Sequence, residues 1–229
     1  MFKKYLKFNL IFALIFLVQI IAEFKHISNL SYFIKPCIAI SLLVMLYVST
    51  KLKGRFHKRL FTGLIFALLG DVLLMFVWKD QSYFTYGLMA FMLCHIFYTR
   101  AFYLDFKSKP ELDKKGARIA IIGCAILSIG FYFFIRPHLG EMKLPVMAYI
   151  FVISLMTMMA CFRNLRVNAS SFNLILTGAL FFLLSDGLIA YDKFVKGFDF
   201  SGLLIIATYM IAQYLITIGA VERQLLHKD

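Results

Sequence analysis

Eight long apolar stretches constrain this chain more than any other feature of its sequence. Each has roughly the 17 to 22 residues that an α-helix needs to cross the hydrocarbon core of a bilayer. Hydrophobic residues make up 62% of the chain and charged residues only 16%, a balance that soluble domains do not have. We therefore predict eight transmembrane helices: Leu6 to Ala22, Ile34 to Thr50, Leu60 to Trp78, Tyr83 to Leu104, Arg118 to Ile135, Leu144 to Phe162, Phe172 to Tyr191 and Leu203 to Val221.

These stretches predict an all-α, multi-pass integral membrane protein with one domain over residues 1–229. The longest connection, from about Asp105 to Ala117, is too short for a second domain. The first stretch has the basic start of a signal peptide, but it is long and lacks a small residue three positions before a cut after Ala22. We expect a retained helix, and in a bacterium a location in the inner membrane. The sequence leaves the oligomeric state open.

Lysine and arginine are unevenly distributed between the two sides of the predicted helices. With the N-terminus in the cytoplasm, 18 of the 25 lie on the cytoplasmic side and 7 on the other. The positive-inside rule then predicts that both termini are cytoplasmic. Because these connections account for the net charge of +13, nucleic acid is not an expected partner. The four cysteines lie within predicted helices and form no CxxC pair, which indicates neither a disulfide framework nor a zinc site.

Two aspartates lie inside apolar segments that resemble each other. Asp71 lies in the segment Gly63 to Phe76 and Asp186 in Gly178 to Tyr191, and the segments share 6 of 14 positions. A charged side chain costs several kcal/mol in hydrocarbon, so an intramembrane aspartate indicates a functional site. Two origins fit the likeness: a duplication of four helices, or chance matches of leucine and phenylalanine between apolar segments.

A duplication would give a parallel 4+4 repeat, because the third and seventh predicted helices run in the same direction. Such a repeat would bring both aspartates to one central cavity at similar depth. At about 1.5 Å of rise per residue, Asp71 is expected roughly 10 Å and Asp186 roughly 8 Å from the non-cytoplasmic helix ends. The alternative for the aspartates is a structural network, for example an ion pair between Asp71 and Lys35.

Other polar residues are predicted at the same depth. Lys35 precedes Pro36 at the expected start of the second helix, where it either reaches into the cavity or extends its amine toward the interface. Tyr209 and Gln213 are spaced by four residues and continue to Thr217, which predicts a polar stripe on the eighth helix, with a role either in the site or in helix packing.

Two aromatic side chains of the sixth and fourth predicted helices are further candidates. Tyr149 either faces the site or anchors the sixth helix at the membrane interface. His95 lies near the middle of the fourth helix and serves either in proton transfer or in packing. No second histidine follows His95 at the spacing of a metal site, so we predict no metal ligand here.

Several motifs occur together, and their combination is more specific than any one of them. They are Lys35-Pro36, Leu69-Gly70-Asp71 with Leu73-Leu74-Met75, Gly87-Leu88 with Phe91, His95 and Tyr98, the stretch Tyr149 to Met156, Leu183-Leu184-Ser185-Asp186, and Tyr209 with Ala212-Gln213. From about Lys35 to Gly219 the chain resembles the YhhN-type lysoplasmalogenases. The resemblance implies an eight-helix membrane hydrolase that cleaves the vinyl ether bond of lysoplasmalogens, a class of lysophospholipid, into a fatty aldehyde and a glycerophospho-ethanolamine or -choline.

That reaction suits two buried carboxyl groups. Vinyl ethers hydrolyse in acid, because protonation of the outer alkene carbon gives an oxocarbenium ion that the ether oxygen stabilises. Burial and a second carboxylate nearby both favour a protonated carboxyl group. We expect Asp71 and Asp186 to be catalytic as acid and base, with the roles left open because the proton belongs to the pair.

The substrate side of the site follows from the same reasoning. Lys35 would bind the phosphate, and Tyr149, Tyr209, Gln213 and His95 would position water or the glycerol hydroxyl. No metal or organic cofactor is expected.

Two other functions also use aspartates inside a membrane. An aspartyl intramembrane protease carries one of its two in a Gly-x-Gly-Asp motif, and here Leu68 replaces the first glycine. A proton-coupled transporter would use the aspartates as proton carriers, but its broken helices and inverted repeats are not indicated by segments that lack proline and run in parallel. A purely structural protein is disfavoured by the cost of burying two carboxylates.

Overall fold

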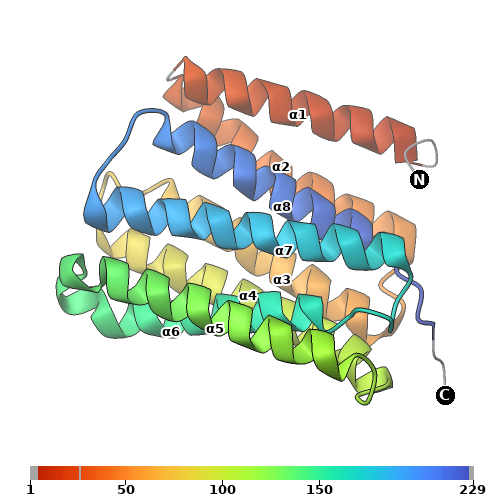
Figure 1. Cartoon of the computed structure of the whole chain (residues 1–229). Coiled ribbons are helices and arrows are strands. Elements are labelled where there is room, and N and C mark those ends of the chain that lie inside the picture. The colour runs from red at the N-terminus through yellow and green to blue at the C-terminus, as the bar shows by residue number, and fades with distance from the viewer. Residues whose placement is uncertain (1–4, 26, 227–229) are drawn as a thin grey trace.

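The computed structural model describes residues 5–25 and 27–226, and within them it is all-helical (Figure 1). Eight long helices follow one another, and the short helical turns η2 (Arg136–His138), η3 (Gly140–Met142) and η4 (Tyr191–Val195) flank three of them. The eight are α1 (Leu6–Phe24), α2 (Ser28–Thr50), α3 (Gly54–Leu74), α4 (Ser82–Ser108), α5 (Lys114–Ile135), α6 (Lys143–Cys161), α7 (Ala169–Ala190) and α8 (Ser201–Val221). The predicted eight-helix fold is confirmed.

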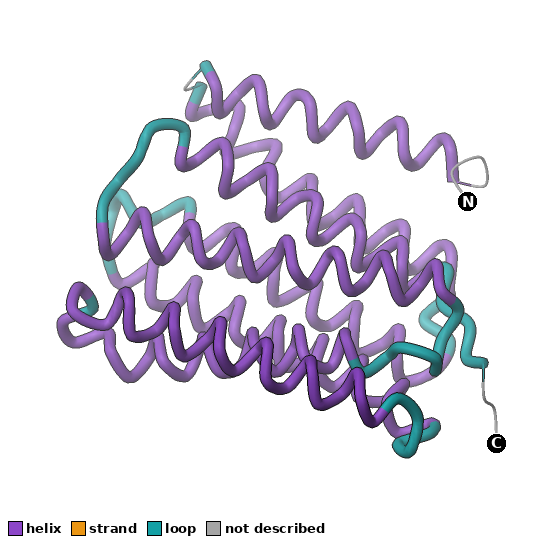
Figure 2. Tube along the Cα trace, in the orientation of Figure 1, coloured by secondary structure: helices purple, strands orange, loops and turns teal. Residues whose placement is uncertain are grey.

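The helices run alternately up and down, so the connecting loops gather at the two ends of the bundle (Figure 2). Helix α1 begins and α8 ends at the same end, here called the terminal end (Figure 1). Seven of the helices are long and apolar enough to cross a membrane. The remaining helix, α3, is also long enough to cross a membrane, but its sequence includes the charged residues Arg55, Lys58, Arg59 and Asp71. The chain is a multi-pass membrane protein, and the cytoplasmic position of the terminal end stays a prediction from loop charge.

Two helix boundaries differ from the predictions in ways that affect the site. Helix α3 ends at Leu74 instead of Trp78, because the Met75 N–H is shared between the carbonyls of Asp71 and Val72 and the chain then turns. Asp71 therefore lies one turn from the helix end. Helix α2 begins at Ser28, which places Pro36 inside the helix and not in its first turn.

The packing of the helices follows the 4+4 arrangement. Helices α3 and α4 pack closely, as do α7 and α8, and the contacts of α1 with α2 and of α2 with α3 recur as α5 with α6 and α6 with α7. The halves meet through α4 on α6 and, in the same relation, through α8 on α2, and α8 also packs on α1. The glycine shared by the two aspartate segments allows a neighbouring helix to approach closely in each half. A Cβ on Gly63 would collide with the Tyr98 ring of α4, and one on Gly178 would lie 2.9 Å from the Ala212 carbonyl of α8.

A buried ionic cluster closes the terminal end of the bundle. The Asp105 carboxylate accepts hydrogen bonds from Nε of Arg163 and from Nε of Arg223, each at 2.8 Å, and both Asp105 and Arg163 are fully buried. Arg166, also buried, donates to the carbonyls of Pro110 and Leu112 in the loop between α4 and α5. The sequence had placed these arginines among loop charges and Asp105 in a connection. The arginines do lie outside the long helices, but the placement of Asp105 is wrong, because α4 extends to Ser108 and the side chains of Arg163 and Arg223 fold inward onto it.

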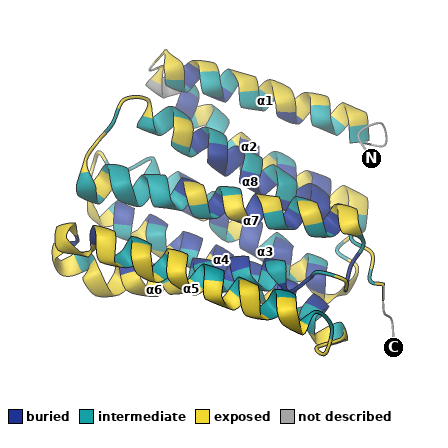
Figure 3. Cartoon of the chain, in the orientation of Figure 1, coloured by how far each residue is buried: buried dark blue, intermediate teal, exposed yellow. Residues whose placement is uncertain are grey.

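Burial differs strongly among the helices (Figure 3). Helix α8 lies at the centre and is the most buried, whereas α5 is the most exposed, with only Ile135 buried. Large apolar side chains cover the outer faces of α1 and α5, as expected of surfaces in contact with lipid.

Candidate active site

Asp186 is held by two side chains from other helices. Tyr149 of α6 donates its hydroxyl hydrogen to Asp186 Oδ2 at 2.5 Å, and His95 Nε2 of α4 lies 3.0 Å from the same oxygen. The hydroxyl hydrogen is committed to the carboxylate, so His95 must donate its own hydrogen from Nε2. His95 is fully buried and its Nδ1 has no hydrogen-bond partner among the described residues, which fits the tautomer that carries its hydrogen on Nε2. For Tyr149, which is buried, the interfacial-anchor alternative is wrong.

Asp71 has a different set of partners. Tyr209 of α8 donates to Asp71 Oδ2 at 2.6 Å. Behind it, Gln213 Nε2 lies 3.5 Å from the Tyr209 hydroxyl, and Tyr98 donates to Gln213 Oε1 at 2.7 Å. All four side chains are buried. The predicted stripe on α8 therefore faces the protein interior, where Tyr209 and Gln213 join one hydrogen-bond chain.

The two aspartates occupy equivalent positions at an offset of 115 residues, but their donors do not, because at this offset Tyr209 corresponds to Cys94 and His95 to Met210. Tyr98 and Gln213 are 115 residues apart, the same offset as Asp71 and Asp186, and they are hydrogen-bonded to each other. A residue that contacts its own repeat counterpart lies at the pseudo-twofold axis. Across this axis each aspartate takes a partner from the other half, Asp71 from α8 and Asp186 from α4.

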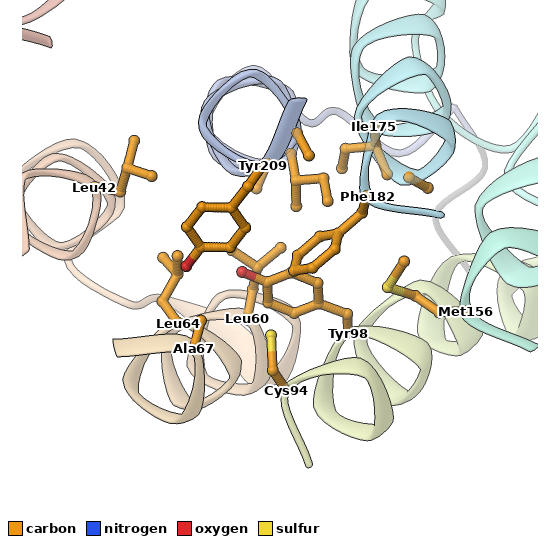
Figure 4. Packing of buried hydrophobic residues seen from close by; sticks show 14 of the residues in the cluster. Leu42, Leu60, Leu64, Ala67, Cys94, Tyr98, Met156, Ile175, Phe182 and Tyr209 are labelled. Atoms are coloured by element: carbon orange, nitrogen blue, oxygen red, sulfur yellow. The ribbon is translucent and has the colours of Figure 1, made fainter. Parts of the chain in front are cut away.

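Aromatic rings lie between the two clusters. Phe91 and Phe182 are 5.8 Å and 5.6 Å from the Tyr209 ring, and Phe182 is also 4.6 Å from the His95 ring. Figure 4 shows Tyr209, Tyr98 and Phe182 directed toward one another in the centre of the bundle. Each carboxylate thus has its own tyrosine donor, and within the described residues no hydrogen bond joins the two carboxylates.

A largely apolar cavity of about 490 Å³ reaches Asp186. Its walls come mainly from α4, α5, α6 and α7, and its polar lining consists of Asp186, Tyr149, Ser128 and Tyr191. Asp71 and Tyr209 do not line it. A cavity of this size with few polar groups is typical of a small-molecule site. Within the described ranges, no three His, Cys, Asp or Glu side chains are grouped as a metal ion would require.

Among the described residues, Lys35 forms no ion pair with Asp71 or Asp186. Its amine is 4.0 Å from Glu23 Oε2 of α1, so the predicted alternative of an Asp71 ion pair is replaced by one with Glu23. Ser31 donates to the same Glu23 oxygen at 3.2 Å and accepts from Gln19 at 2.8 Å. Sequence reasoning missed Gln19 and Glu23, whose signal was a pair of polar residues four apart on one face of an apolar helix.

The YhhN family model matches residues 30–220, which include all the predicted site residues. This chain belongs to the YhhN family. Its relatives include the proteins named lysoplasmalogenase TMEM86A of Bos taurus, 37% identical over 168 residues, and of Homo sapiens, 33% identical over 169 residues. Both alignments cover 72% of this chain and 65% of the relative. Lysoplasmalogenase TMEM86B of Mus musculus is 32% identical over 70% of this chain and 62% of its own length. The chain thus spans a little under two thirds of these relatives. No solved structure gave a significant match.

Proposed function

We propose that this YhhN-family protein hydrolyses the vinyl ether bond of lysoplasmalogens, releasing a fatty aldehyde and a glycerophospho-ethanolamine or -choline. The observation that carries the proposal is the apolar cavity with the hydrogen-bonded carboxylate of Asp186 in its wall. A lysoplasmalogen brings one long apolar chain for the cavity and an acid-labile bond for the carboxyl group. The names of the TMEM86A and TMEM86B relatives agree with this substrate.

Asp186 is the group best placed to act on the bond. Its Oδ2 is occupied by Tyr149 and His95, which leaves Oδ1, without a donor among the described side chains, to carry a proton toward the cavity. The side chain is 11% exposed, so its access is to the cavity rather than to open solvent. Tyr149 and His95 would fix the carboxyl plane and stabilise the carboxylate that forms when the proton leaves.

One carboxyl group completes the cycle. Asp186 transfers its proton to the outer alkene carbon, which leaves an oxocarbenium ion and an Asp186 carboxylate. Water attacks the cationic carbon and its proton returns to Asp186, which gives a hemiacetal. The hemiacetal then breaks its bond to the glycerol oxygen and yields the aldehyde and the alcohol. No metal or redox group takes part in these steps.

Asp71 would contribute from the far side of the Phe91 and Phe182 rings. Held by Tyr209 and supported by Gln213, its carboxylate would stabilise the cationic intermediate electrostatically. Lys35 would attract the phosphate at the end of the bundle opposite the chain termini, where its amine lies 4.0 Å from Glu23 Oε2.

Purified protein should release aldehyde from a lysoplasmalogen. We expect Asp186→Asn to abolish the activity and Asp71→Asn to reduce it strongly, with thermal unfolding in detergent unchanged. Asp80→Asn is the matched control, because this aspartate is exposed in the loop between α3 and α4 and should leave the activity at the wild-type level. Wild-type turnover by Asp186→Asn would disprove the proposed chemistry.

A further inference from the structure

Helix α5 breaks the symmetry between the two halves. Its repeat counterpart α1 packs on both α2 and α8, and Phe12 of α1 stacks on Tyr214 of α8 with 4.7 Å between ring centroids. Among the described residues, α5 packs on α6 and on the turns η2 and η4, but not closely on α4 or α7. The place that α1 fills in one half is therefore left unfilled in the other, and the cavity lies there.

Helix α5 is attached to its neighbours near its middle and at one end. Near its middle, the hydroxyl of Ser128 is hydrogen-bonded to that of Ser154 on α6. At the end opposite the chain termini, Ile135 is buried against Leu139 and Val146. Toward α7, the attachment lies at this same end, where Ala190 joins the apolar cluster and Phe134 stacks on Tyr191 of η4, with 6.2 Å between ring centroids. About one turn nearer the middle of α7, Gly187 faces Phe131, and a Cβ on the glycine would lie 3.8 Å from the phenylalanine ring.

The cavity reaches the lipid-facing surface between α5 and α7. Leu127 of α5 and Leu180 and Leu184 of α7 line the cavity, yet they are 60%, 48% and 50% exposed. A side chain that both lines a cavity and faces outward marks its opening. Because this opening lies along membrane-spanning helices and is lined by leucine, it faces hydrocarbon and not water.

We infer that the gap between α5 and α7 is a lateral entrance, through which the single hydrocarbon chain of a lysolipid passes from the bilayer to Asp186. The chemical step at Asp186 rests on the proposed function, whereas the entrance rests on the geometry of α5. The cavity of about 490 Å³ lies in the size range of pockets that bury most of a small ligand.

Gly187 offers a direct test, because a larger side chain there would narrow the entrance against Phe131. We expect Gly187→Leu to lower kcat/KM for a long-chain lysoplasmalogen at least about tenfold and to leave kcat/KM for a short-chain, water-soluble 1-alkenyl analogue unchanged. Gly130→Leu on α5 is the matched control, because a Cβ at Gly130 meets nothing within 4 Å, and it should leave both rates unchanged. Adding Phe131→Ala to Gly187→Leu should restore most of the long-chain rate.

An equal loss for both substrates, or a wild-type long-chain rate in Gly187→Leu, would overturn the entrance. A second measurement does not need catalysis. A lysolipid with a stable alkyl ether and a photoreactive group in its chain should crosslink to α5 and α7 near Leu127 and Leu184, and crosslinks confined to α1 and α2 would contradict the inference. If the protein did not cleave lysoplasmalogens, this crosslinking would still decide whether a lipid chain enters here.

Discussion

The hydroxyl of Tyr149 should contribute to the rate and not to binding. Tyr149→Phe keeps the ring that packs edge-on against His95, with 5.4 Å between ring centroids, and removes only the hydroxyl that donates to Asp186 Oδ2 at 2.5 Å. A hydrogen bond to a charged group is worth about 1.5–3 kcal/mol. Because the bond strengthens when Asp186 gives up its proton and becomes charged, up to the whole of this free energy is lost from the transition state.

At 1.36 kcal/mol per factor of ten, that loss corresponds to a fall in kcat of about 10- to 150-fold. KM should change by less than about twofold, since the hydroxyl is bonded to the carboxylate and not to the substrate. The assay is steady-state aldehyde release in detergent, with thermal unfolding as a check of folding. Tyr132→Phe is the matched control, because the Tyr132 hydroxyl contacts the Lys143 carbonyl at 3.5 Å and is not part of the site. A loss confined to KM, or an unchanged kcat, would refute this role of Tyr149.

Two further predictions concern stability. Asp105→Asn should lower the free energy of unfolding by about 3–5 kcal/mol, because it leaves Arg163 and Arg223 without their buried counter-charge. Thermal unfolding in detergent would measure this loss. A decrease in the unfolding temperature no larger than that of Asp80→Asn would contradict the prediction. Hydrogen bonds from Asn164 and from the Gly116 backbone hold the pKa of Asp113 below its ordinary value, so the stability they provide is present above about pH 4 and is lost as the pH falls through the lowered pKa. Asp113→Asn should flatten this part of the stability profile, from roughly pH 5 down to roughly pH 2, and an unaltered profile would exclude Asp113 as its source.

The sequence predicts most of what hydrophobicity decides. The number and order of the helices follow from the lengths of the apolar stretches, and the positions of Asp71 and Asp186 follow from the cost of a charge within them. The polar candidates His95, Tyr149 and Tyr209 were identified for the same reason. What the sequence could not give was the pairing, because which tyrosine reaches which aspartate depends on how helices far apart in the chain pack.

The partners of charged residues near helix ends could not be predicted from the sequence either. The sequence suggested that Arg163 and Asp105 are solvated charges of the connecting loops. Local composition does not show that two segments 58 residues apart fold onto each other and bury this pair. Glu23 was missed because its partner Lys35 lies on another helix, although Gln19 on the same face was a local signal. The sequence predicted one central cavity for both aspartates, whereas the cavity in the structure is lined by Asp186 and not by Asp71, because it results from the way α5 departs from the packing of α1.

The hydrogen bond between Tyr98 and Gln213 has a consequence for how two repeats can share one centre. At an exact twofold axis a side chain would meet its own copy. Two identical groups in the same orientation cannot form a hydrogen bond, because one must donate and the other accept. Tyr98 gives its hydrogen to Gln213, whose amide faces the hydroxyl of Tyr209, and Tyr209 donates to Asp71. The chain of donors therefore has a direction, and it ends at one aspartate only. Two carboxylates at equivalent positions of the repeat are therefore chemically unequal, since Asp71 ends this directed chain whereas Asp186 takes its hydrogen bonds from Tyr149 and His95.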